Sequence, residues 1–180
     1  MNRALRVVSA AFKCVLASVM GLLLLYNGYI LVSKYAFGND MPTVFGYGGA
    51  VVVSGSMEPY LCVNDFIITK SQNSYSMGDV IMFYDGTKRE YITHRITYAS
   101  GGVYATQGDA NNAPDPFSVP HAAVVGKVVS VWRGFGKAVR FMQSPAGFFS
   151  VIVAGTVLWW GADLIRGIKG KKRDEKREKN

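Results

Sequence analysis

The feature that most constrains this chain of 180 residues is an uncharged run at residues 14–33, bounded by a lysine on each side. Its twenty residues read CVLASVMGLLLLYNGYILVS. A helix of about 20 apolar residues can cross a bilayer core of about 30 Å, so we expect a transmembrane helix here. The alternative is a cleaved secretory signal, because three basic residues precede the run. Typical signal cores are only about 7 to 15 residues long, and the following VSKYAFG offers no small-x-small cleavage site.

A second apolar stretch, FMQSPAGFFSVIVAGTVLWWGA, occupies residues 141–162 and is also uncharged. It ends in Trp159 and Trp160, and paired aromatic residues of this kind are typical of membrane interfaces. No polar face recurs at helical spacing, which argues against the alternative of a buried core helix. We therefore predict a second transmembrane helix at residues 141–165.

The distribution of charge predicts the topology. Residues 1–13 contain three basic and no acidic residues, and residues 166–180 contain eight basic and three acidic residues. Both tails are therefore expected in the cytoplasm. Residues 35–140 contain eight residues of each sign, so the net charge of +8 belongs mainly to the tails and indicates membrane orientation and attraction to anionic lipid headgroups. No nucleic-acid partner is expected, because the basic residues flank apolar spans.

The region between the two spans predicts a compact β domain with little helix. Six short segments rich in Val, Ile, Tyr, Phe and Thr are separated mostly by turn residues. They are residues 50–54, 66–70, 79–84, 91–98, 103–107 and 124–132. The expected fold class is mainly β, sandwich-like or barrel-like, flanked by an N-terminal and a C-terminal transmembrane helix. The expected organisation is a cytoplasmic start at 1–13, a helix at 14–33, an extracytoplasmic domain at 34–140, a helix at 141–165 and a tail at 166–180.

The segment VVVSGSMEPYL contains the first candidate for chemistry. An apolar strand leads into Ser54, Gly55 and Ser56, and Pro59 then prevents simple continuation of the strand. A serine at such an exit can project into a cleft while nearby backbone N–H groups face a developing oxyanion. Taken alone, the tripeptide is more typical of an ordinary turn.

A nucleophilic serine needs a base, and the segment YITHRITY supplies a candidate. Strict alternation along a strand places Ile92, His94, Ile96 and Tyr98 on one face, so the histidine is the polar member of an apolar face. The alternative for a lone histidine is a core residue bonded to a backbone carbonyl. His121, in SVPHAAV, lacks a comparable setting and is expected at the surface.

The segment TQGDANNAPDP supplies two carboxylates, Asp109 and Asp115. Either could orient an imidazole and stabilise its cationic form, as the acidic member of a serine triad does. The alternative is a turn, because Gly, Asp, Asn and Pro are typical turn residues. Cys14 and Cys62 have neither a CxxC partner nor a metal-type spacing, so packing roles are expected for both.

The segments SGSMEP, GDVIMFY, ITHRI and GDANNAPD, in this order and spacing, resemble type I signal peptidases. The resemblance covers residues 44 to 132 and is to the branch of the endoplasmic reticulum, archaea and sporulation-associated Gram-positive bacteria. That branch has a histidine where the common bacterial branch has a catalytic lysine. The resemblance implies a β-rich serine endopeptidase outside the membrane, with Ser56 as nucleophile, His94 as base and Asp115 as third catalytic member. It also matches Asp109 to a second aspartate of the motif and Ser54 to an oxyanion-hole position.

Several expectations about activity follow from this resemblance. Hydrolysis through an acyl-enzyme requires no metal or organic cofactor, and a neutral histidine base predicts that activity falls at acid pH. The expected partners are signal-peptide-bearing precursors, the lipid bilayer and the export machinery. The expected location is the plasma membrane, or the endoplasmic reticulum membrane in a eukaryote.

Two rival functions remain open at this stage. One is a catalytically silent membrane module for binding or assembly in the export machinery. The presence of both Ser56 and His94 argues against it. The other is a regulatory serine protease that cleaves itself or a dedicated partner, against which the two spans and the histidine base argue.

Overall fold

The computed structural model describes residues 3–38, 41–147 and 149–161, and it divides the chain into two compact units. One unit combines Met1–Ala36 with Met142–Asn180, and the other, here called the β domain, is Phe37–Phe141. The expected tail at 166–180 lies outside the described residues. The boundaries of the β domain lie close to the expected 34–140, although the roles of the five expected segments stay predictions.

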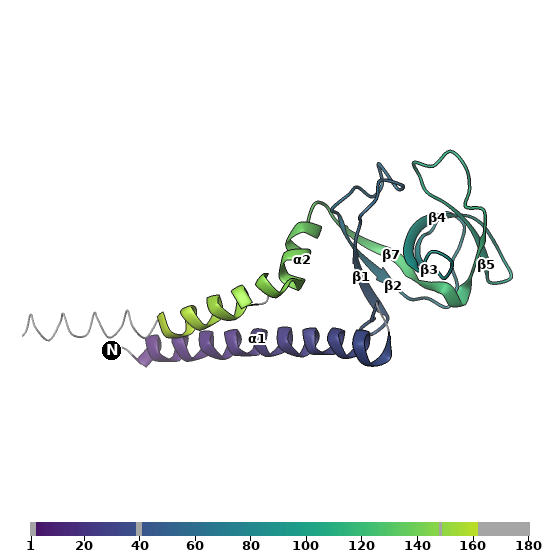
Figure 1. The fold of residues 1–180 in the computed structure, drawn as a ribbon. Coiled ribbons are helices and arrows are strands. Elements are labelled where there is room, and N and C mark those ends of the chain that lie inside the picture. The colour runs from purple at the N-terminus through teal and green to yellow at the C-terminus, as the bar shows by residue number, and fades with distance from the viewer. Residues whose placement is uncertain (1–2, 39–40, 148, 162–180) are drawn as a thin grey trace, which may run out of the picture. The chain divides into compact units, whose positions relative to one another are not determined.

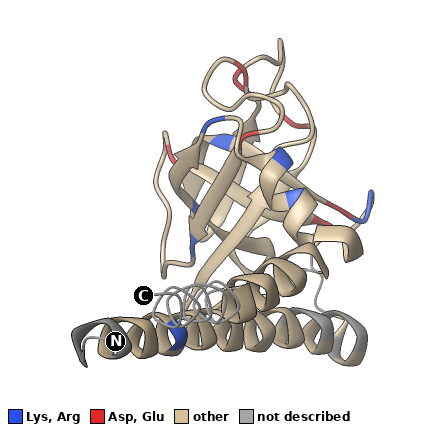
Figure 2. Ribbon diagram, turned by 90° about the vertical axis from the view of Figure 1, so that its left-hand side faces the viewer, with Lys and Arg blue, Asp and Glu red and all other residues tan. Residues whose placement is uncertain are grey.

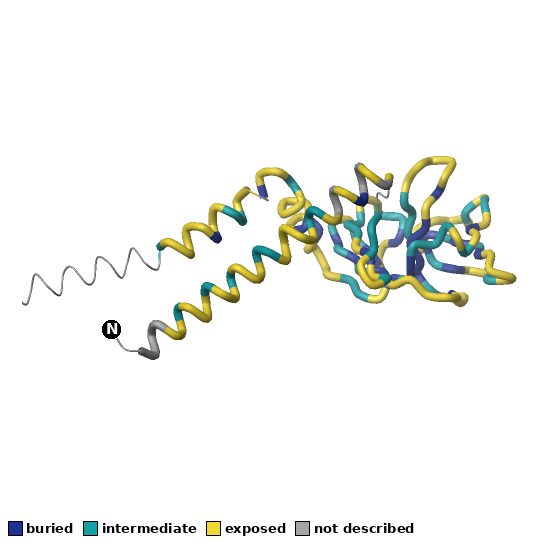
Figure 3. Tube along the Cα trace, turned by 90° about the horizontal axis from the view of Figure 1, so that it is seen from below, coloured by how far each residue is buried: buried dark blue, intermediate teal, exposed yellow. Residues whose placement is uncertain are grey.

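The first unit contains the long apolar helix α1, Arg3–Phe37. Within it, Val7–Tyr29 form a candidate span of 23 residues. Many large apolar residues of α1 are exposed, and the tube in Figure 3 is coloured as exposed along most of the described part of this helix. Among the described helices, only α1 is by itself long and apolar enough to cross a membrane. The expected apolar N-terminal helix is therefore confirmed.

The C-terminal region differs from the single helix expected from residue 141. Helix α2, Gly136–Gln143, ends before Ser144, and a second helical run, Pro145–Gly161, lies at 80° to it. Proline has no N–H to donate, and its ring disfavours a helical conformation of the preceding residue, so the break falls at this point. A C-terminal transmembrane helix is not shown by the described residues, and positions 162–165 lie outside them.

The β domain is one antiparallel sheet, drawn in Figure 1, with seven strands in the order β1-β2-β7-β3-β4-β5-β6. The strands are β1 (Tyr47–Val51), β2 (Phe66–Lys70), β3 (Val80–Asp85), β4 (Glu90–Ser100), β5 (Val103–Gln107), β6 (Ser118–Pro120) and β7 (Val124–Trp132). A short 3₁₀ turn, His121–Ala123, precedes β7. The prediction of a mainly β fold is confirmed. The strands are rich in β-branched and aromatic residues, which favour this conformation.

The bounds of β2, β5 and β7 agree with the sequence prediction, whereas β1 lies three residues earlier than predicted. Two glycines lie in β1, and close neighbours occupy the space that side chains would need there. A Cβ on Gly48 would lie 2.9 Å from Thr69 Oγ1, and one on Gly49 would lie 2.8 Å from the Phe66 ring. The short strand β6 and helix α2 were not predicted.

Two hydrophobic clusters form the core of the β domain. The first contains Tyr75, Ile81, Phe83, Ile96, Tyr104 and Val119, and the second contains Met57, Leu61, Ile67, Val80 and Val128. Adjacent residues of β3 belong to different clusters, because successive side chains of a strand point to opposite faces. Strand β3 is thus buried on both faces, and Figure 3 shows the buried residues gathered among the strands.

The predicted alternation of β4 holds as far as Ile96 and then fails. A register shift between β4 and β5 occurs at Ile96/Tyr98, so Thr97 is an additional residue in β4. A bulge of this kind shifts the faces of the following side chains. Tyr98 is consequently 64% exposed, and its placement on the buried face was wrong.

Candidate active site

Ser56 lies in the loop after β1, and two backbone hydrogen bonds close the base of that loop. The Val52 N–H donates to the Asp65 carbonyl at 2.9 Å, and the Asn64 N–H donates to the Val52 carbonyl at 2.9 Å. Met57, directly after Ser56, is only 2% exposed and belongs to the second core cluster. The closed base and the buried methionine together hold the serine in a fixed position. We call residues 53–63 the serine loop.

Strand β4 positions His94 beside this loop. His94 pairs with Ile81 of β3, and its imidazole is steeply inclined to the Phe83 ring, at 70° with 6.5 Å between ring centroids. The side chain of His94 is 8% exposed. Its Nε2 lies 3.2 Å from Ser56 Oγ. The structure therefore brings together the serine and the histidine that the sequence analysis selected.

Asp115 lies on the other side of the imidazole. Its Oδ2 is 2.7 Å from His94 Nδ1, and its side chain is 11% exposed. The same oxygen accepts a hydrogen bond of 2.7 Å from Thr106 Oγ1. The sequence left open which aspartate faces the histidine, and the structure places Asp115 there. Thr106 was missed, because a threonine within β5 is indistinguishable from an ordinary strand former.

These contacts form a continuous chain from Ser56 through His94 to Asp115. The carboxylate beside Nδ1 favours the tautomer with hydrogen on that atom, which leaves Nε2 free to accept a hydrogen bond from the serine hydroxyl. An imidazole in this state can take the serine proton as the oxygen attacks a carbonyl carbon. The adjacent carboxylate stabilises the resulting imidazolium. The geometry therefore suits acyl transfer through a serine.

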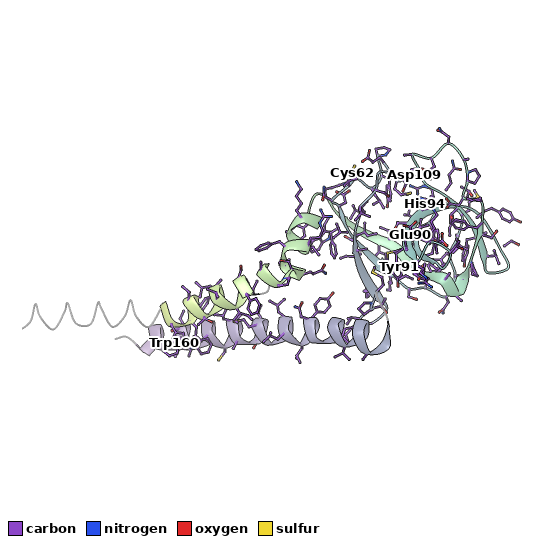
Figure 4. All side chains as sticks on the ribbon, viewed as in Figure 1. Cys62, Glu90, Tyr91, His94, Asp109 and Trp160 are labelled. Atoms are coloured by element: carbon purple, nitrogen blue, oxygen red, sulfur yellow. The ribbon has the colours of Figure 1, made fainter. Side chains whose placement is uncertain are left out.

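Asp109 has a different partner. Arg95 donates two hydrogen bonds to the Asp109 carboxylate, from Nε at 2.8 Å and from Nη2 at 2.6 Å. Arg95 Nη1 also donates to the Gly78 carbonyl at 3.0 Å. The hydrogen bond to Asp109 raises the pKa of Arg95 above its ordinary value. The guanidinium lies over the Tyr60 ring at 4.9 Å. Through Arg95, Asp109 links the segment after β5 to β4 and to the turn at Gly78. Figure 4 labels Asp109 and His94.

The segment after β5 packs directly on the serine loop. The Ala110 N–H donates to the Ser56 carbonyl at 2.9 Å. A Cβ on Gly108 would lie 2.5 Å from the same carbonyl oxygen, a distance that real Cβ atoms essentially never show. Gln107 Nε2 donates to the Asn111 carbonyl at 2.8 Å and supports the turn. Glycine at position 108 therefore allows the segment after β5 to approach the serine loop closely.

Asp65 joins the end of the serine loop to the end of β7. It is 2% exposed and accepts hydrogen bonds from the N–H groups of Cys62 and Gly134 and from Arg133 Nη1, all at 2.9 Å. Burial by itself would raise the pKa of Asp65, but these hydrogen bonds and the Arg133 charge outweigh it and lower the pKa below 3.8. Asp65 is a buried anchor that the sequence analysis missed.

The remaining candidates are placed as follows. Ser54 Oγ lies 3.3 Å from Ser56 Oγ, so the two hydroxyls are neighbours. His121 is half-buried, and its Nδ1 lies 3.1 Å from the Tyr104 hydroxyl. His121 was expected at the surface, but its ring is only partly exposed because it packs against the rings of Tyr75 and Tyr104. Cys14 and Cys62 are both free thiols.

Charge in the β domain is mixed in sign, as Figure 2 shows, with acidic and basic positions interspersed over its strands and loops. Within the described part of the chain, no group of three or more His, Cys, Asp or Glu residues could hold a metal ion. The chemistry of the site is therefore interpreted from the hydrogen-bonded residues Ser56, His94 and Asp115.

Comparison with known proteins gives a distant relative. The chain is 33% identical over 93 residues to signal peptidase I W of Bacillus subtilis (strain 168). The match covers 48% of this chain and 48% of the relative, so the chain matches about half of that protein's length. No family model matches the chain. The similarity supports a distant relationship to type I signal peptidases.

Proposed function

We propose that this chain is a membrane-bound serine endopeptidase that removes N-terminal signal peptides from exported proteins. The observation that carries the proposal is the hydrogen-bonded chain from Ser56 through His94 to Asp115, with distances of 3.2 Å and 2.7 Å. The distant similarity to a protein named signal peptidase I supports the proposed substrate class. A histidine, and not a lysine, at the proposed base position supports placing the chain in the serine/histidine branch of these enzymes.

In this mechanism Ser56 is the nucleophile and His94 is the general base. His94 Nε2 takes the hydroxyl proton while Ser56 Oγ attacks the scissile carbonyl carbon, and Asp115 stabilises the imidazolium. The imidazolium then protonates the leaving amine, which releases the mature protein and leaves the signal peptide as an ester on Ser56. Water, activated by His94, hydrolyses this ester and restores the serine.

The developing oxyanion needs donors close to Ser56. Ser54 is proposed as one of them, because its hydroxyl lies 3.3 Å from Ser56 Oγ within the same loop. The backbone N–H of Ser56 is proposed as the second donor, in the manner of serine hydrolases that use the nucleophile's own amide. Loss of one such donor typically lowers kcat about 10²- to 10³-fold.

The membrane assignment rests on α1, whose candidate span contains 23 residues. We propose that α1 tethers the β domain near the bilayer surface, where the cleavage region of an exported precursor emerges. A second span near residues 141–165 and cytoplasmic positions for both termini complete this topology, which follows from the basic tails. The proposed location is the plasma membrane, or the endoplasmic reticulum membrane in a eukaryotic host.

The experiment is cleavage of a secretory precursor by the detergent-solubilised protein and by Ser56→Ala and His94→Ala variants. Mass spectrometry of product N-termini should find a single cut after a small residue with the wild type. Both variants should lose activity by on the order of 10⁴-fold or more, as serine enzymes do when a triad member is removed. Folding of the variants is checked by thermal unfolding.

Unchanged cleavage in either variant would contradict the proposed roles of Ser56 and His94. Absence of cleavage by the wild type across several precursors would favour the rival function of a silent assembly module. Cleavage confined to the chain itself or to one dedicated partner would favour the regulatory protease instead.

A further inference from the structure

The side chain of Thr106 is buried beside the catalytic carboxylate. Thr106 is 0% exposed and belongs to β5, where it pairs with Ile96 of β4 in the sheet. Its hydroxyl donates to Asp115 Oδ2 at 2.7 Å, the usual length of an O–H···O hydrogen bond. A buried hydroxyl without such a partner would be costly, so this bond fixes the threonine rotamer as well as the carboxylate.

The backbone of Thr106 holds the same aspartate from a second direction. The Asp115 N–H donates to the Thr106 carbonyl at 2.8 Å. Asp115 comes from an irregular segment outside the strands, whereas Thr106 comes from a paired strand within the sheet. The two bonds therefore attach a residue of a loop to a rigid element, which is the way that enzymes position catalytic groups.

The acceptor atom is the reason that this contact bears on catalysis. Thr106 Oγ1 and His94 Nδ1 both approach Oδ2 of Asp115, at 2.7 Å each. A carboxylate held by one hydrogen bond alone could rotate about its terminal bond, because that torsion is broad. The threonine bond selects the rotation that directs Oδ2 to the imidazole.

We propose that Thr106 is a positioning residue of the active site, which holds Asp115 Oδ2 in place to fix the orientation and tautomer of His94. This inference rests on the proposed function for its catalytic consequence. With Thr106 included, four residues are joined by hydrogen bonds in the order Ser56, His94, Asp115 and Thr106. In this proposal Thr106 acts through Asp115 and touches neither the substrate nor the nucleophile.

The kinetic test compares Thr106→Val, which removes the hydroxyl and keeps the shape, with Thr106→Ser, which keeps the hydroxyl. Thr106→Val should lower kcat for precursor cleavage roughly 10- to 100-fold at unchanged KM, as small misplacements of catalytic groups do. Thr106→Ser should remain close to wild type. The matched control is Thr97→Val. The Thr97 hydroxyl donates to the Ala105 carbonyl and takes no part in the hydrogen bonds that join Thr106, Asp115, His94 and Ser56.

A double substitution separates positioning from a general structural effect. If Thr106 acts through Asp115, the Thr106→Val change should cause no further loss of kcat in an Asp115→Asn background. Multiplicative losses would overturn the inference, and so would a Thr106→Val protein as active as wild type.

A spectrum tests the same contact without catalysis. The chain contains two histidines, so ¹⁵N-histidine labelling gives few imidazole signals, and a His121→Gln variant assigns those of His94. The His94 Nδ1–H signal should be present in wild type and Thr106→Ser and be lost or strongly shifted in Thr106→Val. An unchanged signal in Thr106→Val would overturn the inference. Because this readout needs no substrate, failure of the peptidase proposal would be distinguishable from failure of the Thr106 role.

Discussion

At the scale of single residues, the two aspartates of GDANNAPD differ in what they hold. Asp115 Oδ2 contacts the imidazole of His94, whereas Asp109 forms a bidentate ion pair with Arg95. One carboxylate therefore belongs to the hydrogen-bonded series Ser56–His94–Asp115, and the other belongs to the connection between β4 and the serine loop. Replacement of each should have a different consequence, although both lie within seven residues of the sequence.

Asp115→Asn should lower kcat for precursor cleavage by roughly 10³- to 10⁴-fold, because the amide favours the wrong histidine tautomer. Asp109→Asn should instead lower the melting temperature, because it weakens the bidentate ion pair with Arg95. The protein that remains folded should keep most of its kcat. Steady-state kinetics beside thermal unfolding checks both. Equal losses of kcat in the two variants would contradict this division of roles.

Asp65 gives a prediction about pH. Its pKa is lowered in the folded protein, so its stabilisation is present above the ordinary value of 3.8 and is lost as pH falls through the lower folded pKa. Asp65→Asn should reduce the free energy of unfolding of the β domain by roughly 1.5 to 3 kcal/mol at neutral pH. Denaturant unfolding at several pH values should show this difference shrinking below pH 3.8. A difference that stays constant with pH would contradict the role of the charge.

The residues that carry chemistry were predictable where a local pattern marks them. Ser56 follows a strand and precedes a proline, and His94 interrupts an apolar face, so both were candidates, and their combination with the family resemblance selected them over an ordinary turn and a core histidine. Thr106 and Asp65 could not, because their importance depends on tertiary contacts that no local pattern of residues marks. Thr106 meets Asp115 nine positions away, and Asp65 meets Arg133 at a separation of 68.

At the scale of elements, the approach of the segment after β5 to the serine loop depends on Gly108. Gly108→Ala would place a methyl group 2.5 Å from the Ser56 carbonyl oxygen, and a backbone atom cannot move aside cheaply. We expect a loss of about 1 to 3 kcal/mol in stability, together with a fall in kcat from displacement of Ser56.

Gly86→Ala is the matched control for this change, because a Cβ on Gly86, between β3 and β4, would meet nothing within 4 Å. Unfolding and cleavage assays on both variants measure the effect. The account would be contradicted if Gly108→Ala behaved like Gly86→Ala.

Elements with a strong residue pattern were predictable, and those defined by tertiary contacts were not. Strands β2, β5 and β7 are continuous runs of strand-forming residues, and the sequence predicts their bounds. Strand β1 contains glycines that are explained only by its neighbours Thr69 and Phe66. The break at Ser144 could have been expected from Pro145, since proline rarely continues a helix from the preceding residue.

At the scale of the whole molecule, the proposed topology places the β domain outside the cytoplasm. In a background with Cys14→Ser and Cys62→Ser, a Ser100→Cys reporter at the exposed end of β4 should react with a membrane-impermeant maleimide in intact cells. An Asn180→Cys reporter should react only after lysis, because the basic tail is expected inside. Labelling of Ser100→Cys only after lysis would contradict this orientation.

The central claim is that Ser56 forms a covalent acyl-enzyme during cleavage of a precursor, and rapid acid quenching followed by mass spectrometry tests it most directly. The predicted result is a Ser56-containing peptide heavier by the mass of the acyl signal peptide less one water, present in the first turnover and absent from His94→Ala. An ester on another residue, or efficient cleavage with Ser56 unmodified throughout the first turnover and replaceable by alanine, would contradict the account.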